Sequence, residues 1–192
     1  MLKYFIIFSF IFIGFPAFSL TQKEIDYIHN GGIIIVDKPV KNTNNKAIEA
    51  TFWINSTPKQ IFEVLTDHEK IPEFMPFIVD CKVLDHKGNI FDVYFKAQQM
   101  GFNVEYVLRR IYEKYRKISW SKLKGDMKTI EGYWLFTPDP SGKGTISTYF
   151  VFVEPGMLVP QEISRYLQKQ GLPDMIKSVK KRVESCGVWK KK

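Results

Sequence analysis

The middle of the chain alternates between apolar and polar residues with the two-residue period of a β-strand. From Phe91 to Gln98 the odd-numbered positions are apolar, and from Phe102 to Arg109 the even-numbered positions are apolar. Turn-forming residues separate six segments that we predict to be strands: Val79–His86, Asn89–Met100, Phe102–Glu113, Arg116–Leu123, Ile130–Thr137 and Gly144–Glu154. One apolar and one polar face are typical of an antiparallel meander that is covered on one side.

Further elements precede this series of strands. Residues Ile33–Val40 and Ala47–Asn55 are two apolar runs separated by Asn-rich residues, a pattern that predicts a β-hairpin. The sequence TPKQ at Thr57–Gln60 is suited to begin a helix, with threonine as the N-cap, proline at the first helical position and glutamine as the reciprocal cap. A short leader helix is expected over Thr21–His29.

The stretch VLTDHEKIPEFMPFIVDC, residues 64–81, begins like an amphipathic helix and then meets Pro72 and Pro76. Two prolines at this spacing prevent one continuous helix. Phe74 and Phe77 are among the bulky apolar residues around the prolines, and we interpret this segment as a lid across the opening of an apolar cavity. The alternative is that these residues complete a packed core without a cavity.

The C-terminal part of the chain predicts one long helix that begins at Pro160. Its apolar residues keep helical spacing: Ile163, Tyr166, Leu167, Leu172, Ile176, Val179 and Val183. Gly171 and Pro173 predict a kink or a brief break. Basic residues are assigned to the outer face of this helix: Lys177, Lys180, Lys181 and Arg182.

Composition places the chain among folded, single-domain proteins. It has 192 residues, of which 45% are hydrophobic and 15% aromatic, enough to bury a core. The net charge of +8 favours anionic partners such as a membrane surface. A basic surface that is simply solvated is the other interpretation.

The N-terminal residues 1–19 have the features of a signal peptide. Lys3 is followed by an apolar run from Tyr4, and Ala17 and Ser19 supply the small residues of a cleavage site. We therefore expect cleavage after Ser19 and a periplasmic or secreted bacterial protein. An uncleaved membrane anchor is the competing interpretation.

The sequence carries none of the usual catalytic or metal-binding motifs. The three histidines, at positions 29, 68 and 86, have no metal-ligand spacing, and we expect no metal and no cofactor. We assign Asp67-His68-Glu69 to a solvated linker, and Glu105 with Arg109 to a surface ion pair on one strand. The sequence leaves open whether Cys81 and Cys186 form a disulfide, and we favour free thiols.

The order of elements and two local stretches of sequence resemble a known superfamily. IFEVLTDHEKIPEFMPFIVDCKVL, with Asp67, Pro72 and Pro76, is similar to the helix–break–helix stretch of START-like proteins of the polyketide cyclase/dehydrase (SRPBCC) superfamily. Residues 118–160, with Gly132-x-Trp134, resemble its later strands. Within the superfamily, the sequence is most similar to coenzyme Q-binding START-domain proteins. The resemblance covers about residues 47–183.

The resemblance implies an α+β helix-grip fold, in which a curved antiparallel sheet wraps around a long C-terminal helix and two short helices follow the first strands. The chain then divides into a signal peptide (1–19), a leader and hairpin arm (20–45), a START-like domain (46–188) and a basic tail (189–192). Relatives hold apolar ligands between sheet and helix. The expected ligand-binding residues are Phe74, Phe77, Phe91, Phe95, Phe102, Tyr106, Trp120, Trp134, Tyr149 and Leu167.

Three classes of function are open at this point. The first is an exported carrier or binding protein for a lipid, quinone or polyaromatic molecule, a monomer without nucleic-acid partners, with Lys177, Lys180, Lys181 and Arg182 facing an anionic membrane. The second is a cyclase or aromatase that uses polar groups in the cavity, for which the candidates are His68, Tyr106, Tyr149 and Glu105. The third is a periplasmic protein-interaction module. We favour a function without catalysis.

Overall fold

The computed structural model describes residues 20–41, 43, 45–99, 101–154 and 171–192. In these residues one antiparallel sheet of eight strands has the order β1-β2-β8-β7-β6-β5-β4-β3. The strands are β1 (Ile33–Pro39), β2 (Lys46–Ile54), β3 (Ile78–Lys87), β4 (Ile90–Gln99), β5 (Phe102–Glu113), β6 (Lys117–Gly125), β7 (Thr129–Pro138) and β8 (Thr145–Glu154). The predicted hairpin and meander are therefore confirmed.

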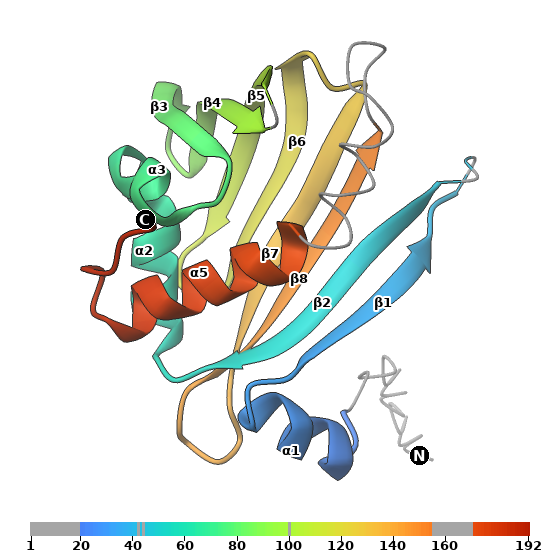
Figure 1. The fold of residues 1–192 in the computed structure, drawn as a ribbon, viewed down its shortest axis with the longest axis vertical. Coiled ribbons are helices and arrows are strands. Elements are labelled where there is room, and N and C mark those ends of the chain that lie inside the picture. Colours follow the sequence, from blue (N-terminus) through green and yellow to red (C-terminus); the bar gives the residue numbers. More distant parts are fainter. Residues whose placement is uncertain (1–19, 42, 44, 100, 155–170) are drawn as a thin grey trace, which may run out of the picture.

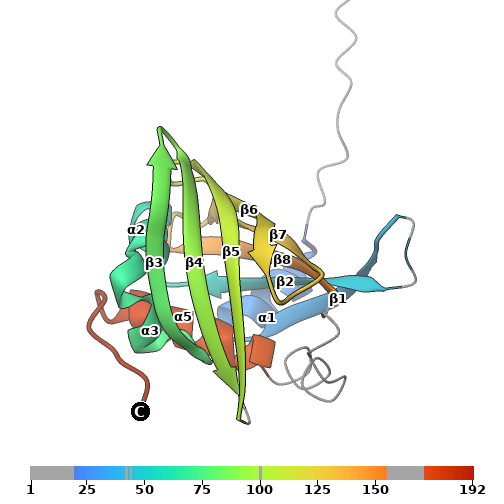
Figure 2. The same cartoon turned by 90° about the horizontal axis from the view of Figure 1, so that it is seen from above.

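The sheet curls around helix α5 (Leu172–Glu184), which crosses its concave face (Figure 1). Figure 2 shows the strands from β3 to β1 wrapping over this helix from one side to the other. Helix α2 (Pro58–Thr66), a 3₁₀ turn (His68–Lys70) and α3 (Ile71–Phe74) lie beside β3, and α1 (Gln22–His29) lies below β1 and β2. This is the predicted helix-grip arrangement.

Some predicted features lie outside the described residues. They are the signal peptide over residues 1–19, the start of the C-terminal helix at Pro160, and the positions of Ile163, Tyr166 and Leu167. Within the described part of the chain, no helix is long and apolar enough to cross a bilayer.

Reciprocal caps fix the start of both early helices. The Thr57 side chain accepts a hydrogen bond from the backbone N–H of Gln60, whose side chain accepts one from the backbone N–H of Thr57. Thr21 and Glu24 make the same exchange in α1. Each exchange satisfies two donors that a helix start otherwise leaves unpaired. The capping box predicted at Thr57–Gln60 is therefore confirmed, and the expected leader helix has one of the same kind.

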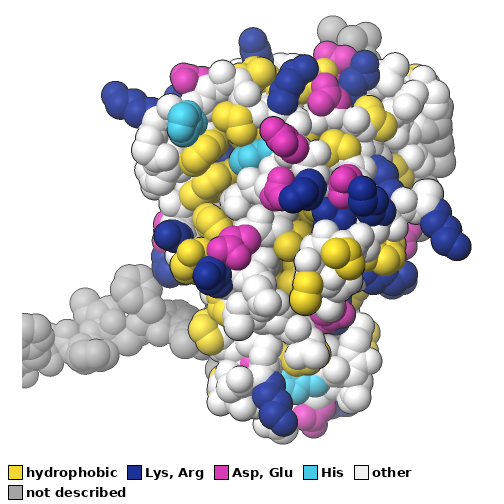
Figure 3. All heavy atoms as spheres, turned by 90° about the vertical axis from the view of Figure 1, so that its left-hand side faces the viewer, with side chains coloured by type: hydrophobic (Ala, Val, Ile, Leu, Met, Phe, Trp, Pro, Cys, Tyr) yellow, Lys and Arg dark blue, Asp and Glu magenta, His cyan; other side chains and the backbone are white. Residues whose placement is uncertain are grey.

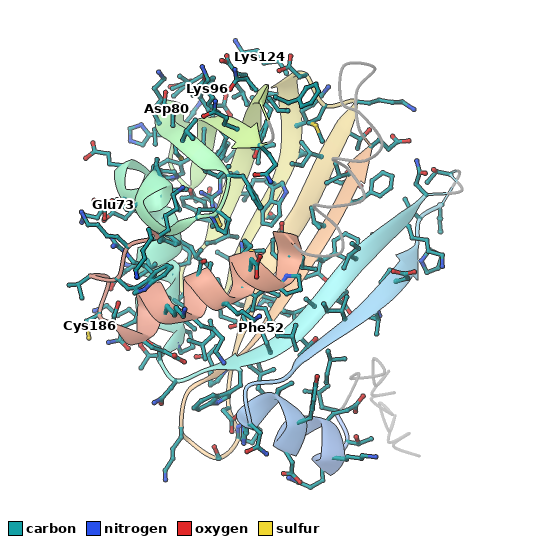
Figure 4. All side chains as sticks on the ribbon, viewed as in Figure 1. Phe52, Glu73, Asp80, Lys96, Lys124 and Cys186 are labelled. Atoms are coloured by element: carbon teal, nitrogen blue, oxygen red, sulfur yellow. The ribbon has the colours of Figure 1, made fainter. Side chains whose placement is uncertain are left out.

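The core fills the space between α2, α5 and the concave face of the sheet. The inward residues of α5 are fully or almost fully buried: Leu172, Ile176, Val179 and Val183. They pack with Ile61 and Leu65 of α2 and with Phe52 of β2, which is labelled between α5 and β2 in Figure 4. Burying an aliphatic or aromatic side chain of this size contributes roughly 1.5–3 kcal/mol, so this contact stabilises the fold substantially.

A glycine on β7 makes room for an aromatic residue of the concave face. Gly132 is paired with Trp120 of β6, and a Cβ atom at this position would lie 2.7 Å from the indole Cζ2 and would collide with the backbone oxygen of Phe150. Any larger side chain would push the indole or the neighbouring strand away. The Gly132-x-Trp134 pair thus has a direct role in shaping the sheet.

One polar expectation is changed by the structure. Glu105 and Arg109 do not pair with each other: Glu105 contacts Lys96, 3.2 Å away, and Arg109 forms a bidentate pair with Asp92. Both partners lie on β4, because residues directly opposite on neighbouring strands are closer than residues four apart on one strand. The predicted ion pair within β5 is therefore wrong.

The two cysteines are free thiols. Cys81 is buried, and burial raises its pKa to about 12. Cys186 follows the end of α5 and projects away from the body of the protein (Figure 4). This answers the question that the sequence left open about a disulfide.

Candidate functional site

A cavity of about 300 Å³ lies between the concave face of the sheet and α5. Strands β4 to β8 supply most of its wall, together with the segment after α3 and the start of α5. The wall is almost entirely apolar, and aliphatic residues such as Ile48, Val104, Leu108, Ile130 and Val151 separate the aromatic ones. A cavity of this size and character matches sites for small lipophilic molecules.

Most of the aromatic residues expected to bind a ligand line this cavity. They are Phe77, Phe95, Phe102, Tyr106, Trp120, Trp134 and Tyr149. Phe77 precedes β3, and the other six lie on strands that bring them together because every second side chain points to the concave face. The alternation in the sequence was therefore the correct signal for this wall.

Two expected residues are not part of the cavity wall, and a third cannot be placed. Phe74 is completely buried in the core, where the Arg182 guanidinium lies 5.4 Å from its ring centroid. Phe91 stacks on Tyr112, with ring centroids 4.6 Å apart. Leu167 lies outside the described residues.

The segment after α3 forms part of one edge of the cavity. Met75, Pro76 and Phe77 line it, whereas Phe74, one residue earlier, belongs to the core. Pro72 lies in the first turn of α3 and so helps to begin this short helix, while Met75 ends it in an extended conformation. The lid interpretation thus agrees with the position of residues 75–77, and the core interpretation describes Phe74.

A buried ion pair ties this edge to the C-terminus. The Arg182 side chain is buried and donates a hydrogen bond of 2.8 Å to Glu73 of α3 and another of 2.8 Å to the Trp189 carbonyl. Lys190 pairs with the other oxygen of Glu73 at 2.9 Å. Hydrogen bonds from Lys190 and Arg182 hold the pKa of Glu73 below its usual value.

The last residues of the chain are bound to the lid segment. The backbone N–H of Lys191 donates to the Glu73 carbonyl, and its ammonium donates to the carbonyls of Met75 and Ile78, each at 2.8 Å. Figure 4 shows Glu73 next to this C-terminal segment. Residues 189–191 therefore form a strap across α3, which the expectation of a basic tail did not include.

The basic face predicted for the C-terminal helix is smaller than expected. Arg182 is only 2% exposed, so its assignment to the outer face is wrong: helical spacing placed it beside the lysines, but Glu73 attracts it inward. Lys180 is partly buried and donates to the Trp53 carbonyl at 2.6 Å, and burial lowers its pKa. Lys177 and Lys181 remain exposed.

Figure 3 shows acidic and basic side chains interspersed on the face around α2 and α3.

The polar groups of the cavity are few. Tyr106 and Tyr149 line it, burial raises the pKa of both, and neither hydroxyl has a hydrogen-bond partner among the described residues. Arg110 also lines it, although it is only 5% exposed. Sequence reasoning missed Arg110, yet the signal was present: it continues the even-numbered inward row of β5 that begins at Phe102.

His68 and Glu105, named as candidates for acid–base chemistry, do not line the cavity. His68 is only 8% exposed and its Nε2 lies 2.7 Å from the Tyr112 hydroxyl, so its assignment to a solvated linker is wrong. Burial, and then the positive charge of Arg110, lower the pKa of His68 to about 4. Glu105 is exposed on the convex face, where it pairs with Lys96.

Comparisons with known proteins agree with this architecture. The family described as polyketide cyclase/dehydrase and lipid transport matches residues 54–180. The sequence matches none of the curated proteins with which it was compared.

Solved structures share the fold at low sequence identity. A STAR-related lipid transfer protein from Xanthomonas axonopodis is 16% identical, with a TM-score of 0.68 over 80% of this chain and 94% of that one. Human StAR-related lipid transfer protein 5 is 8% identical, with a TM-score of 0.65 over 80% and 83% of the two chains. The Zhui aromatase/cyclase from Streptomyces sp. R1128 is 16% identical, with a TM-score of 0.60 over 72% and 93%.

The buried histidine predicts a loss of stability in mild acid. Since the pKa of His68 is about 4 in the folded protein against 6.5 normally, the unfolded chain binds a proton first. The contribution of His68 is fully present above pH 6.5 and is lost as the pH falls towards 4. Each pKa unit corresponds to about 1.4 kcal/mol, so the free energy of unfolding should fall by about 2 kcal/mol from this group between pH 7 and pH 5.

Urea unfolding at a series of pH values measures this effect. His68→Gln should remove most of the pH dependence between pH 6.5 and 4.5, whereas His86→Gln, at an exposed position, should keep it. An unchanged pH profile in His68→Gln would contradict the assignment.

The ion pair beneath the strap predicts unequal effects of its two partners. Glu73→Gln leaves the buried Arg182 charge without a carboxylate, whereas Arg182→Met leaves Glu73 partly exposed and still paired with Lys190. Because an uncompensated buried charge is the costlier defect, we expect Glu73→Gln to lower the urea midpoint further than Arg182→Met. Glu63→Gln, in an exposed pair with Lys59, serves as the control and should leave the midpoint unchanged. Equal losses in the first two variants would contradict this account.

Proposed function

The chain belongs to the polyketide cyclase/dehydrase and lipid transport family, and from this premise we propose that it is an exported carrier of a lipophilic small molecule. The ligand would lie in the cavity between the sheet and α5. Family and architecture together indicate a hydrophobic ligand-binding domain. The single observation that carries the proposal of a carrier is the apolar, aromatic wall of a cavity of about 300 Å³, which residues 75–77 border at one edge.

The chemistry of the wall favours binding over catalysis. Among the described residues, the cavity lining includes no carboxylate and no histidine, the groups that most often transfer protons in enzymes. Tyr106 and Tyr149 are protonated at neutral pH, as an ordinary tyrosine is, and burial raises the pKa of each further from neutrality. A cavity with these groups can hold and orient a ligand, and a carrier needs nothing more.

Export would bring this carrier close to a membrane. The proposal of export rests on residues 1–19, whose apolar run and small terminal residues are typical of a cleaved signal. In the periplasm a monomer could exchange its ligand with a bilayer, and Lys177 and Lys181 are exposed cations of α5 that would face anionic lipid.

A variant that fills the cavity should lose the ligand. Ala97 lines the cavity from β4, so Ala97→Trp places an indole in the space that a ligand would occupy. We expect the purified wild-type protein to carry lipophilic molecules, seen by native mass spectrometry and lipid extraction, and Ala97→Trp to carry none. Uptake of a fluorescent fatty acid or quinone should fall at least about tenfold, a change of about 1.4 kcal/mol in binding free energy.

The neighbouring position supplies a matched control. Gln98 is exposed on the opposite face of β4, so Gln98→Trp adds the same side chain outside the cavity and should bind like the wild type. A wild-type protein that is always empty and takes up neither probe would overturn the proposal of a carrier.

Export predicts a defined N-terminus. Cleavage after Ser19 leaves a mature chain that begins at Leu20. Expressed in a Gram-negative host, the protein should appear in the periplasmic fraction with the corresponding intact mass. A full-length chain in the membrane fraction would instead support an uncleaved anchor.

A further inference from the structure

One cationic side chain interrupts the apolar wall of the cavity. Arg110 on β5 lines the cavity and is 5% exposed. Its only hydrogen bond to a described residue is a long one, 3.3 Å from Nη2 to the Leu65 carbonyl. Its Nη1 is buried and has no partner among these residues. An arginine has five N–H donors, so most of the hydrogen-bonding capacity of this group is unused.

The charge of Arg110 is also uncompensated in the described part of the chain. No carboxylate there lies within ion-pair distance of it, and its guanidinium carbon lies over the Tyr112 ring, 5.3 Å from the ring centroid. The other buried arginine, Arg182, is paired with Glu73. Arg109, the exposed residue that precedes Arg110 on β5, is paired with Asp92. Burying an unpaired charge is costly. Unlike Arg182, Arg110 has no carboxylate among the described residues to offset this cost.

Arg110 lies at the inner end of the cavity. It is paired in register with Phe91 and Trp120 on the adjacent strands and contacts Leu65 of α2. Phe102, eight residues earlier on the same strand, is 44% exposed and lies at the other end of the wall. At about 3.3 Å per residue these ends are roughly 26 Å apart along β5. Gln99 of β4 is paired in register with Phe102 and also lines the cavity. The cavity therefore has one cationic end and one exposed end without charge.

We propose that Arg110 binds the head group of the ligand and that the ligand is a lipophilic monocarboxylic acid, with its tail directed towards Phe102. This inference rests on the proposed function of the cavity. A single carboxylate balances the single charge of Arg110, whereas a phosphate dianion would leave one negative charge buried without a partner. The guanidinium geometry suits a carboxylate, which accepts two of its N–H groups. The unpartnered hydroxyls of Tyr106 and Tyr149 lie in the same cavity as further donors.

Binding of three probes with one hydrocarbon tail tests the head-group preference. They are hexadecanoic acid, its methyl ester and hexadecyl phosphate, each titrated into delipidated protein. Binding is followed by the change in tryptophan fluorescence, to which Trp120 and Trp134 contribute from the cavity wall. The wild type should bind the acid about 10- to 100-fold more tightly than the ester, the usual worth of a hydrogen bond to a charged group. The phosphate should bind more weakly than the acid.

Two variants locate the preference. Arg110→Met should weaken binding of the acid to the level of the ester and leave the ester almost unchanged. Arg109→Met removes the same charge from the convex face of the same strand and should bind all three probes like the wild type. Without ligand, Arg110→Met should be at least as stable as the wild type in urea, because it removes a buried charge without breaking a pair.

The outcomes separate this inference from the proposed function. If neither acid nor ester binds but the purified protein retains another lipophilic molecule or takes up the quinone probe, only this inference fails. If it is also always empty and takes up no probe, the proposal of a carrier fails with it. If acid and ester bind equally and Arg110→Met changes neither, the cavity is a carrier site and only the role of Arg110 is overturned. Tighter binding of the phosphate overturns the carboxylate class, and a large loss of stability in ligand-free Arg110→Met shows a structural role instead.

Discussion

The need to cover the concave face of a curved sheet governs the rest of this structure. A strand sends every second side chain to that face, and α5 lies across it with Leu172, Ile176, Val179 and Val183 buried. The same rows of side chains build the core where they meet the helices and the cavity wall where they do not. Core and site are therefore one surface, and a change in the inward row of a strand alters both.

This shared surface explains what could be predicted from the sequence. Local patterns located the strands, the capped helix starts and seven of the aromatic residues around the cavity, because alternation and capping depend on neighbours in sequence. Contacts between distant segments could not be predicted. The bond between Lys191 and Met75 joins residues 116 positions apart, and Arg182 turns inward for Glu73, which no helical pattern indicates. Phe74 was assigned to the lid because its neighbours belong there, yet the last turn of α3 directs it into the core.

Two buried arginines show how the surroundings of a charge decide its role. Arg182 reaches a carboxylate and a carbonyl, so its burial fixes the position of α3 and the strap. Arg110 reaches one distant carbonyl and an aromatic face. A count of apolar residues identifies neither arginine as buried, although Arg110 continues the inward row of β5. The two act oppositely: a satisfied buried charge specifies the arrangement of the protein, and an unsatisfied one favours any ligand that supplies the missing acceptor.

The residues that shape the fold therefore differ from those proposed to select a ligand. Gly132 admits the indole of Trp120, and Thr57 and Pro58 begin α2, so these residues shape a sheet and a helix. They do not predict the identity of the ligand. The information about the ligand lies in the few cavity residues that an apolar core does not need. Arg110 is the costliest of them, and its position at the inner end of the wall gives the cavity a polarity that aliphatic and aromatic side chains alone cannot provide.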